Sequence, residues 1–295
     1  MGHSHSKNKH KDILANPVVY QQPQQQVQQQ YQGLAPPVQQ QQLPQYQGLA
    51  PPQAQQVLQD PFLFFFQKYQ ISPYYRNDLM TLGQFDIVLV LDDSGSMSTA
   101  TENGTRWSEL KGMATPIVEL GSLLDSDGID VIFLNRGTRR NVRSINDIQD
   151  LLVNPPQYRT PLSNKVREAM SLAKGKPQLI LIMTDGEPYT VDDQRDPNFD
   201  SVHVFRRVLE VERNSDLAYV SILKCSNNDD DTGYLDVMDK QLRNLDVIDD
   251  YVSERNEVLR KQGPNFQYTP GDNIARFLLG SIFPRYDNMD ERFLE

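Results

Sequence analysis

The sequence predicts one α/β domain with a doubly wound, mostly parallel sheet and helices on both faces, preceded by a disordered, glutamine-rich tail. Three observations support this prediction. After residue 60 the composition changes abruptly from glutamine and proline to apolar and charged residues. From residue 85 onward, short apolar runs alternate with segments of helical periodicity, as in strand–helix–strand units. The runs are almost continuously apolar, which is typical of parallel strands buried on both faces.

Length, charge and cysteine content exclude several classes of protein. A chain of 295 residues is long enough for one large or two small domains. Its one cysteine, Cys225, cannot form an intrachain disulfide, so we expect a reducing, cytoplasmic environment. Apolar runs such as 62–66 and 87–91 are too short to cross a bilayer. The net charge of −10 argues against nucleic acid as a partner.

Residues 1–60 are the expected disordered tail, basic at its start and rich in glutamine and proline thereafter. They contain too few apolar residues to repay the conformational entropy that folding costs. Residues 1–6 fit the N-myristoylation pattern, with Gly2 as the lipid acceptor, and three lysines follow within residues 7–11. A lipid chain and adjacent lysines together would form a reversible membrane anchor. The alternative is a basic start without lipid, and the sequence leaves both open.

Aromatic residues crowd the segment 61–84, directly after the tail. We expect this segment to be an N-terminal extension that covers part of the hydrophobic core. So many aromatic side chains could instead dock on a membrane or a partner. The α/β domain itself is expected to span residues 85–283, with residues 284–295 as a C-terminal tail.

Five apolar runs predict the strands of the sheet, and three stretches with apolar residues at intervals of three and four predict helices between them. The strands are expected at 85–91, 129–134, 179–183, 217–223 and 245–248. The helical faces begin at Trp107, Leu162 and Phe205. Pro116 lies inside the first of these helices and predicts a kink or a break there.

Acidic and hydroxyl residues follow two of the predicted strands. Asp92, Ser94 and Ser96 come directly after the first apolar run, and Asp185 comes just after the third. Ligands in parallel sheets bind beyond the carboxyl ends of the strands, and side chains two positions apart in an extended loop point the same way. Oxygen ligands without histidine or cysteine favour a hard cation such as Mg²⁺. The alternative is that Asp92 caps a helix and that Asp185 begins an ordinary Asp-Gly turn.

The same residues resemble a known family. Asp92-x-Ser94-x-Ser96 after an apolar strand, Thr160 ahead of a helix, and Asp185 after a later strand look like the three parts of the metal-ion-dependent adhesion site of von Willebrand factor A (vWA) domains. The resemblance implies that Mg²⁺ or Mn²⁺ is bound by five residues, namely Asp92, Ser94, Ser96, Thr160 and Asp185. It also implies that an acidic residue of a partner protein completes the coordination shell.

The resemblance extends over residues 85–283 and implies a Rossmann-like sheet with one antiparallel edge strand, which residues 139–145 could supply. Further segments, among them Arg106–Lys111 and Asp246–Asp250, are similar to intracellular vWA proteins of fungi and protists.

Two residues near the expected metal site bear on the choice of partner. Arg159 stands where the family usually has a small residue, so its guanidinium could weaken cation binding, or it could point outward and bind the partner's carboxylate. We favour the second interpretation. Glu187, two positions after Asp185, could lie on the same rim and select among partners, or it could be a solvated loop residue.

These inferences predict a non-enzymatic, metal-dependent protein-binding module in which Mg²⁺ captures an acidic residue of a partner. One alternative is a metal-dependent hydrolase or phosphatase. Against it, Ser94 stands where a haloacid-dehalogenase-type site needs a second aspartate, and no phosphate-binding Gly-Lys-Ser/Thr loop occurs. Another alternative is a membrane-tethered or condensate-forming scaffold that acts through the tail.

Overall fold

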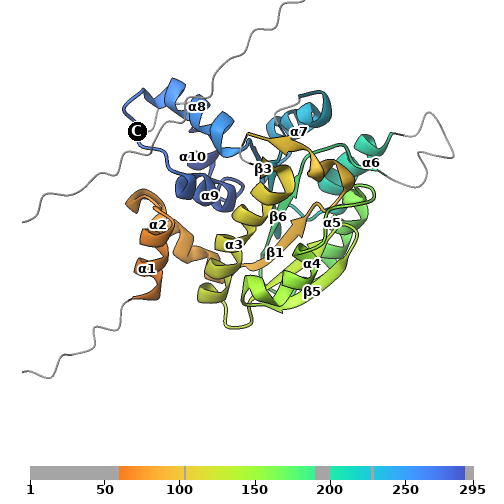
Figure 1. Ribbon diagram of the computed structural model, residues 1–295, viewed down its shortest axis with the longest axis horizontal. Coiled ribbons are helices and arrows are strands. Elements are labelled where there is room, and N and C mark those ends of the chain that lie inside the picture. Colours follow the sequence, from red (N-terminus) through yellow and green to blue (C-terminus); the bar gives the residue numbers. More distant parts are fainter. Residues whose placement is uncertain (1–59, 103, 190–199, 227–228, 290–295) are drawn as a thin grey trace, which may run out of the picture. The chain divides into compact units, whose positions relative to one another are not determined.

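The computed structural model describes residues 60–102, 104–189, 200–226 and 229–289 (Figure 1). The chain divides into two compact units, and all of these residues belong to the second, Val57–Glu295. The tail expected over residues 1–60, which includes Gly2, lies outside the described residues except for its last residue.

Six strands in the described residues form one mixed, mostly parallel sheet in the order β5-β4-β1-β6-β7-β8. They are β1 (Asp86–Leu91), β4 (Ile129–Phe133), β5 (Gly137–Val142), β6 (Gln178–Thr184), β7 (Ala218–Lys224) and β8 (Leu245–Ile248). All neighbours pair in parallel except β5, which is antiparallel to β4. The five predicted strands are confirmed, and the antiparallel edge strand lies close to the expected residues 139–145. Two further strands, β2 (Ala100–Thr101) and β3 (Gly104–Thr105), form a short separate ribbon.

Helices cover both faces of the sheet, as a doubly wound fold requires. One face carries α1 (Pro61–Lys68), α2 (Pro73–Thr81), α3 (Arg106–Leu124), α4 (Gln149–Leu152), α8 (Tyr251–Gln262), α9 (Pro270–Leu279) and α10 (Pro284–Asp287). The other carries α5 (Leu162–Ser171), α6 (Ser201–Arg207) and α7 (Asp229–Gln241). Successive residues of β1 alternate between the two cores: Leu89 and Leu91 pack on the first face, and Val88 and Val90 on the second.

The N-terminal extension packs against the rest of the domain, and Figure 1 shows α2 beside α9 and α1 beside α3. Phe65 on α1 is fully buried in the core. The amide and hydroxyl of Ser72 each donate a hydrogen bond of 2.8 Å to the carboxylate of Asp272. The two backbones also approach closely, because a Cβ atom on Gly271 would lie only 2.0 Å from the carbonyl oxygen of Tyr69. The extension is therefore part of the folded core.

Residues 284–289, at the start of the expected C-terminal tail, form α10 and the turn after it. Tyr286 and Met289 are fully buried there. The hydroxyl of Tyr75 on α2 lies 3.3 Å from the sulfur of Met289. This part of the chain therefore closes the core over the extension.

Pro116 does not break its helix, contrary to one of the two outcomes that we predicted from the sequence. The helix α3 runs without interruption from Arg106 to Leu124. Ala114 and Ile117, on either side of the proline, are buried against the sheet. Packing before and after the proline therefore outweighs the hydrogen bond that the proline cannot make.

None of the helices in the described residues is long and apolar enough to cross a membrane.

Candidate functional site

The candidate site lies at the carboxyl ends of β1 and β6, which are adjacent and parallel. The register pairs Leu91 with Met183, and the amide of Asp92 donates to the carbonyl oxygen of Met183 at 3.0 Å. The segments that follow the two strands therefore lie side by side. This confirms the expectation that Asp92 and Asp185 come from neighbouring strand ends.

Hydrogen bonds connect four of the five predicted ligands. The Ser94 amide donates to Oδ1 of Asp92 at 2.8 Å, and the hydroxyls of Ser94 and Ser96 lie 3.1 Å apart. The Ser96 hydroxyl donates in turn to Oδ1 of Asp185 at 2.8 Å. A cluster of carboxylate and hydroxyl oxygens is thus assembled from two separate loops, as the sequence predicts.

The local backbone reaches this arrangement by a route that differs from the predicted extended loop. The bond from the Ser94 amide to Asp92 closes a side-chain turn of the kind that aspartate favours, and a 3₁₀ turn follows over Gly95–Ser98. Gly95 is not among the glycines with a left-handed φ, so the turn does not depend on that conformation there. Its amide donates instead to the carbonyl oxygen of Tyr158 at 3.1 Å.

Asp92 is fully buried and holds a second hydrogen bond that sequence reasoning missed. The Thr184 hydroxyl, at the end of β6, donates to Oδ2 of Asp92 at 2.6 Å. Burial, and then the negative charge of Asp185, raises the pKa of Asp92 to about 7. An ionised Asp92 therefore favours a positive charge beside it. The threonine at the very end of β6 is the sequence signal that could have revealed this contact.

Thr160, the fifth predicted ligand, is buried in the segment that leads into α5. The carbonyl oxygen of Tyr158, two residues before Thr160, accepts a hydrogen bond from the Gly95 amide. This segment therefore lies against the loop that follows β1. The Thr160 carbonyl accepts hydrogen bonds from the amides of Leu162 and Tyr189, each at 2.8 Å. These contacts involve the backbone of Thr160 and place the residue next to the cluster. They do not show what the Thr160 hydroxyl binds.

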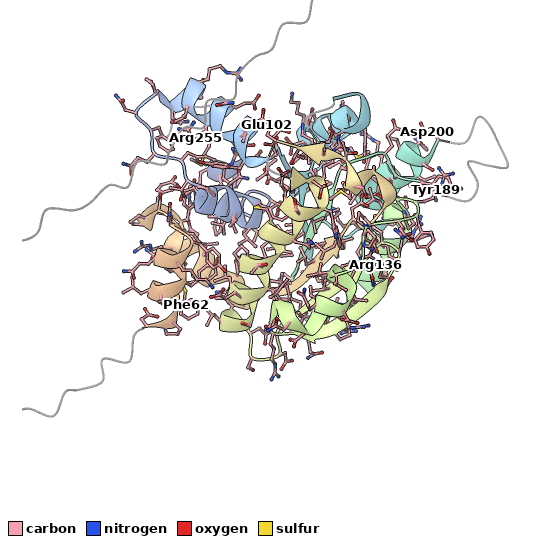
Figure 2. The ribbon with its side chains drawn as sticks, viewed as in Figure 1. Phe62, Glu102, Arg136, Tyr189, Asp200 and Arg255 are labelled. Atoms are coloured by element: carbon pink, nitrogen blue, oxygen red, sulfur yellow. The ribbon has the colours of Figure 1, made fainter. Side chains whose placement is uncertain are left out.

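Arg159 and Glu187 both lie at the exposed rim. The guanidinium of Arg159 stacks over the ring of Tyr189, with 4.8 Å between the guanidinium carbon and the ring centroid. Arg159 is exposed in this arrangement, and the partner-binding role that we favoured for it stays a prediction. Burial, then the negative charge of Asp92 and last that of Glu187, raises the pKa of Tyr234. Figure 2 shows Tyr189, next to the site, and Phe62, on the N-terminal extension, on opposite sides of the view.

A different arginine, Arg106, contacts the cluster directly. Its Nη1 donates to Oδ2 of Asp185 at 2.8 Å, and its Nη2 donates to the hydroxyl of Ser226 at 2.8 Å. Sequence reasoning quoted Arg106 only within a segment of family resemblance. Arg106 contacts Asp185 because α3 begins close to the end of β6 in the folded structure. The spacing of residues in the sequence does not predict this position.

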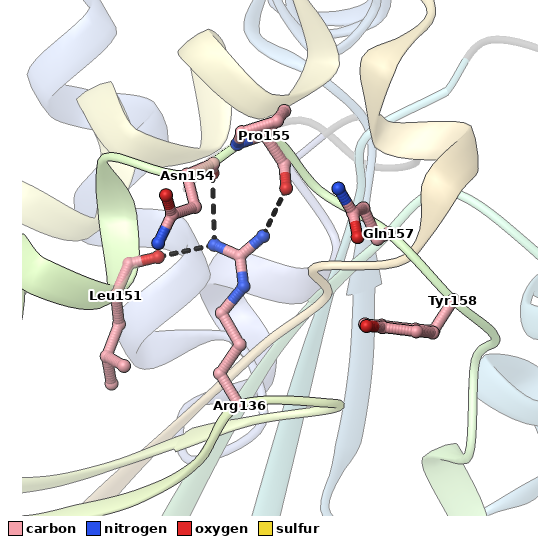
Figure 3. A pocket seen from close by; sticks show the side chains of 6 residues that line it. All are labelled: Arg136, Leu151, Asn154, Pro155, Gln157 and Tyr158. Atoms are coloured by element: carbon pink, nitrogen blue, oxygen red, sulfur yellow. Dashed lines mark hydrogen bonds between the residues drawn. The ribbon is translucent and has the colours of Figure 1, made fainter.

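Asp93, between two predicted ligands, points away from the cluster and supports the neighbouring loops. Its Oδ1 accepts hydrogen bonds from the amide and the side chain of Asn135 at 2.8 and 3.0 Å, and its Oδ2 pairs with Nε of Arg136 at 3.1 Å. Arg136 also donates to the carbonyl oxygens of Leu151, Asn154 and Pro155 (Figure 3). These residues, with Gln157 and Tyr158, line a pocket of about 300 Å³. Arg136 therefore fixes the position of the loop that precedes Thr160.

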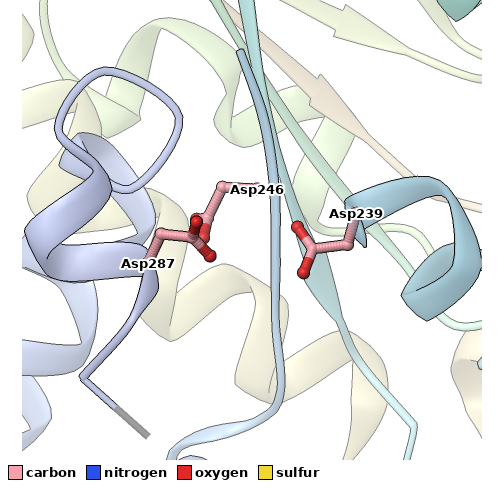
Figure 4. A group of neighbouring side chains, drawn as sticks. All are labelled: Asp239, Asp246 and Asp287. Atoms are coloured by element: carbon pink, nitrogen blue, oxygen red, sulfur yellow. The ribbon is translucent and has the colours of Figure 1, made fainter. Parts of the chain in front are cut away.

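A second group of carboxylates lies elsewhere in the fold and was not predicted. Ligand oxygens of Asp239 on α7, Asp246 on β8 and Asp287 on α10 lie within 4.8 Å of one another (Figure 4). Asp246 is buried and the other two are half-buried. Three carboxylates are a ligand set that hard cations use, so this group is a candidate acidic metal site, and the structure does not identify the metal.

The donor set at the strand ends fits a hard divalent cation. Two carboxylates and two hydroxyls converge within hydrogen-bonding distance of each other, and no sulfur or imidazole is among them. Burial and the charge of Asp185 disfavour the ionised form of Asp92, and a cation bound beside it would stabilise that form.

Comparison with protein-family models gives no match for this chain, and comparison with curated proteins gives no significant match either. What the structure shows is therefore an α/β domain with a mostly parallel six-stranded sheet and a cluster of oxygen ligands at the ends of two central strands.

Proposed function

We propose that this chain is a non-enzymatic, metal-dependent protein-binding module of the vWA type. In this proposal Asp92, Ser94, Ser96, Thr160 and Asp185 hold Mg²⁺ or Mn²⁺ at the strand ends. The single observation that carries the proposal is the set of hydrogen bonds that links Asp92 to the Ser94 amide, the Ser94 hydroxyl to the Ser96 hydroxyl, and the Ser96 hydroxyl to Asp185. An oxygen cluster without a catalytic histidine or cysteine is suited to holding a hard cation.

The charges of the site explain why such a cation would bind a partner. Two carboxylates balance a divalent ion, and the serine and threonine hydroxyls are neutral. The bound metal therefore stays electrophilic and supplies an open coordination position for one more anionic oxygen. An aspartate or glutamate of a partner protein is the ligand of this kind that we propose.

The exposed rim supplies a second contact in this proposal. Arg159 is exposed and its guanidinium lies over the ring of Tyr189, so it can pair with a carboxylate that approaches the metal. Glu187 is exposed on the adjacent loop and would repel a partner with acidic residues at the wrong spacing. We place the protein in the cytoplasm, where Mg²⁺ is plentiful and the lone Cys225 stays reduced.

The proposal is tested by titrating the metal-free full chain with Mg²⁺ and with Mn²⁺ in a calorimeter. We expect Asp92→Asn and Asp185→Asn each to abolish binding at this site. Asp216→Asn removes the same charge from an exposed ion pair and should bind like the wild type. Because the acidic group on α7 and β8 could also take up metal, Asp239→Asn serves as a second control that should keep the strand-end site intact. Metal binding that survives in both Asp92→Asn and Asp185→Asn but is lost in Asp239→Asn would reject the proposal.

A further inference from the structure

A positively charged side chain, that of Arg106, lies within the candidate metal site. The guanidinium of Arg106 pairs with Oδ2 of Asp185 at 2.8 Å, and the side chains are 15% and 0% exposed, respectively. The other end of the guanidinium is fixed by the hydroxyl of Ser226 at 2.8 Å. The arginine is thus held by two partners from different strand ends, after β6 and after β7.

The position of Arg106 in its helix makes this contact notable. Arg106 is the first residue of α3, and Thr105 caps the helix through a hydrogen bond from the Ser108 amide at 3.1 Å. The N-terminus of a helix carries partial positive charge, so a cationic side chain there is unfavourable unless a counter-ion offsets it. Asp185 is that counter-ion. The pairing therefore determines where the guanidinium lies, because the helix by itself would repel it.

A guanidinium at Asp185 and a divalent cation in the same cluster compete for one carboxylate. The Oδ1 atom of Asp185 accepts a hydrogen bond from the Ser96 hydroxyl, whereas Oδ2 accepts one from Arg106. Both charges are positive, and the Asp185 side chain between them is 0% exposed, which weakens the screening between them. A metal ion that enters must therefore push the guanidinium away or bind beside it against repulsion.

We propose that Arg106 is a built-in competitor of the metal: it neutralises Asp185 in the metal-free protein and lowers the affinity of the site for divalent cations. This inference rests on the proposed metal site and adds the residue that sets its affinity. Arg106 thereby keeps the buried carboxylate paired when the metal is absent and shifts metal loading to higher free Mg²⁺ concentrations.

Two measurements on the full-length protein test this inference. In calorimetry, Arg106→Gln should bind Mg²⁺ about tenfold more tightly than the wild type, because the repulsion is gone. In thermal unfolding with a chelator, the same variant should melt at a lower temperature than the wild type, because Asp185 is left buried without its counter-ion. Added Mg²⁺ should then raise its melting temperature by more than that of the wild type.

A matched control removes an arginine of equal charge far from the cluster. Arg243 lies between α7 and β8, where it forms an exposed ion pair with Asp216. Arg243→Gln should leave both the Mg²⁺ affinity and the chelated melting temperature as in the wild type. Any general effect of the net charge on Mg²⁺ binding would show equally in this variant.

A second variant keeps the charge and loosens its anchor, in case Arg106→Gln does not fold. Ser226→Ala removes the hydroxyl that accepts from Nη2. The guanidinium then loses one charge-assisted hydrogen bond, and Mg²⁺ should bind more tightly than to the wild type, by no more than the factor of about ten expected for Arg106→Gln.

The outcomes separate the inference from the function on which it rests. If the wild type binds Mg²⁺ through Asp92 and Asp185 but Arg106→Gln binds with equal or lower affinity, the competition is rejected and the metal site stands. If the wild type does not bind Mg²⁺ whereas Arg106→Gln does, the competition stands and the protein-binding role as proposed fails. If neither binds Mg²⁺, both are rejected.

Discussion

The Thr184 hydroxyl holds one oxygen atom of the Asp92 carboxylate in place. Both side chains are fully buried, and the hydroxyl donates to Oδ2 at 2.6 Å. Water does not reach this position, so a carboxylate that lost this donor would find no replacement. Groups that hold a ligand in place in this way are as much a part of a metal site as the ligands themselves.

Replacing Thr184 by valine therefore tests the role of this contact. Thr184→Val keeps the shape of the side chain and removes the donor, so we expect the affinity for Mg²⁺ to fall by about tenfold to a hundredfold. Thr184→Ser keeps the hydroxyl and should bind within a few-fold of the wild type. The measurement is the same calorimetric titration. Wild-type affinity in Thr184→Val would show that the hydrogen bond does not orient Asp92 for the metal.

The spacing of residues in the sequence predicted which residues form the cluster. It did not predict which long side chains lie around the cluster. Asp92, Ser94 and Ser96 lie close together along the chain, and the parallel strands bring Asp185 beside them. The charged neighbour was harder to predict, because an arginine side chain reaches several ångströms in a direction that only the fold determines. Arg159, adjacent to Thr160 in sequence, stacks on Tyr189, whereas Arg106 reaches Asp185.

At the scale of elements, the N-terminal extension shows how unequal two adjacent phenylalanines are. Phe65 is 0% exposed and Phe64 is 55% exposed, although both belong to α1. Phe65 packs at an angle on Tyr69, with the ring centroids 4.9 Å apart. The helix thus contributes one face to the core and leaves the other in water.

Two substitutions measure how firmly the extension is attached. Phe65→Ala should lower the free energy of unfolding by about 3–5 kcal/mol, because a large buried ring is lost. Phe64→Ala should change it by less than about 0.5 kcal/mol. Denaturant titration of the full chain gives both values. If Phe65→Ala cost no more than Phe64→Ala, the extension would be a loosely held docking segment, the alternative that the aromatic composition left open.

The strands and the helix α9 differ in how far the sequence reveals the burial of their residues. The strands were predictable because burial on both faces leaves long apolar runs. The helix α9 was not predicted, although Ile274, Phe277 and Leu278 recur at helical intervals, and the sequence does not show that Asp272, Asn273 and Arg276 are buried with them. Arg276 is neutralised inside the protein by Glu254 of α8. Polar residues are buried only where the fold brings them a partner, so an apolar pattern alone does not predict which of them enter the core.

At the scale of the whole molecule, the sheet could be predicted and the second acidic group could not. Alternating strands and helices leave few topologies, and the parallel order places the carboxyl ends of β1 and β6 together. Asp239, Asp246 and Asp287 come from α7, β8 and α10. No motif joins them along the chain, so only the packing of α10 brings the last of them to the other two.

The remaining question at this scale is whether the N-terminal segment recruits the domain to a membrane. Residues 1–59 lie outside the described part of the structure, so the argument rests on Gly2 and the lysines that follow it. A single myristoyl chain gives an association constant of about 10⁴ M⁻¹, and each lysine near an anionic surface adds about 1 kcal/mol.

The myristoylated full chain should therefore sediment with vesicles that contain phosphatidylserine. Gly2→Ala should reduce the bound fraction at least about tenfold, and replacing the three lysines by glutamine should reduce it by less. The fragment 60–295 should stay in the supernatant while keeping the melting temperature of the full chain. Equal sedimentation of the myristoylated chain and Gly2→Ala would show that the lipid plays no part, and would leave recruitment to the partner that the metal site captures.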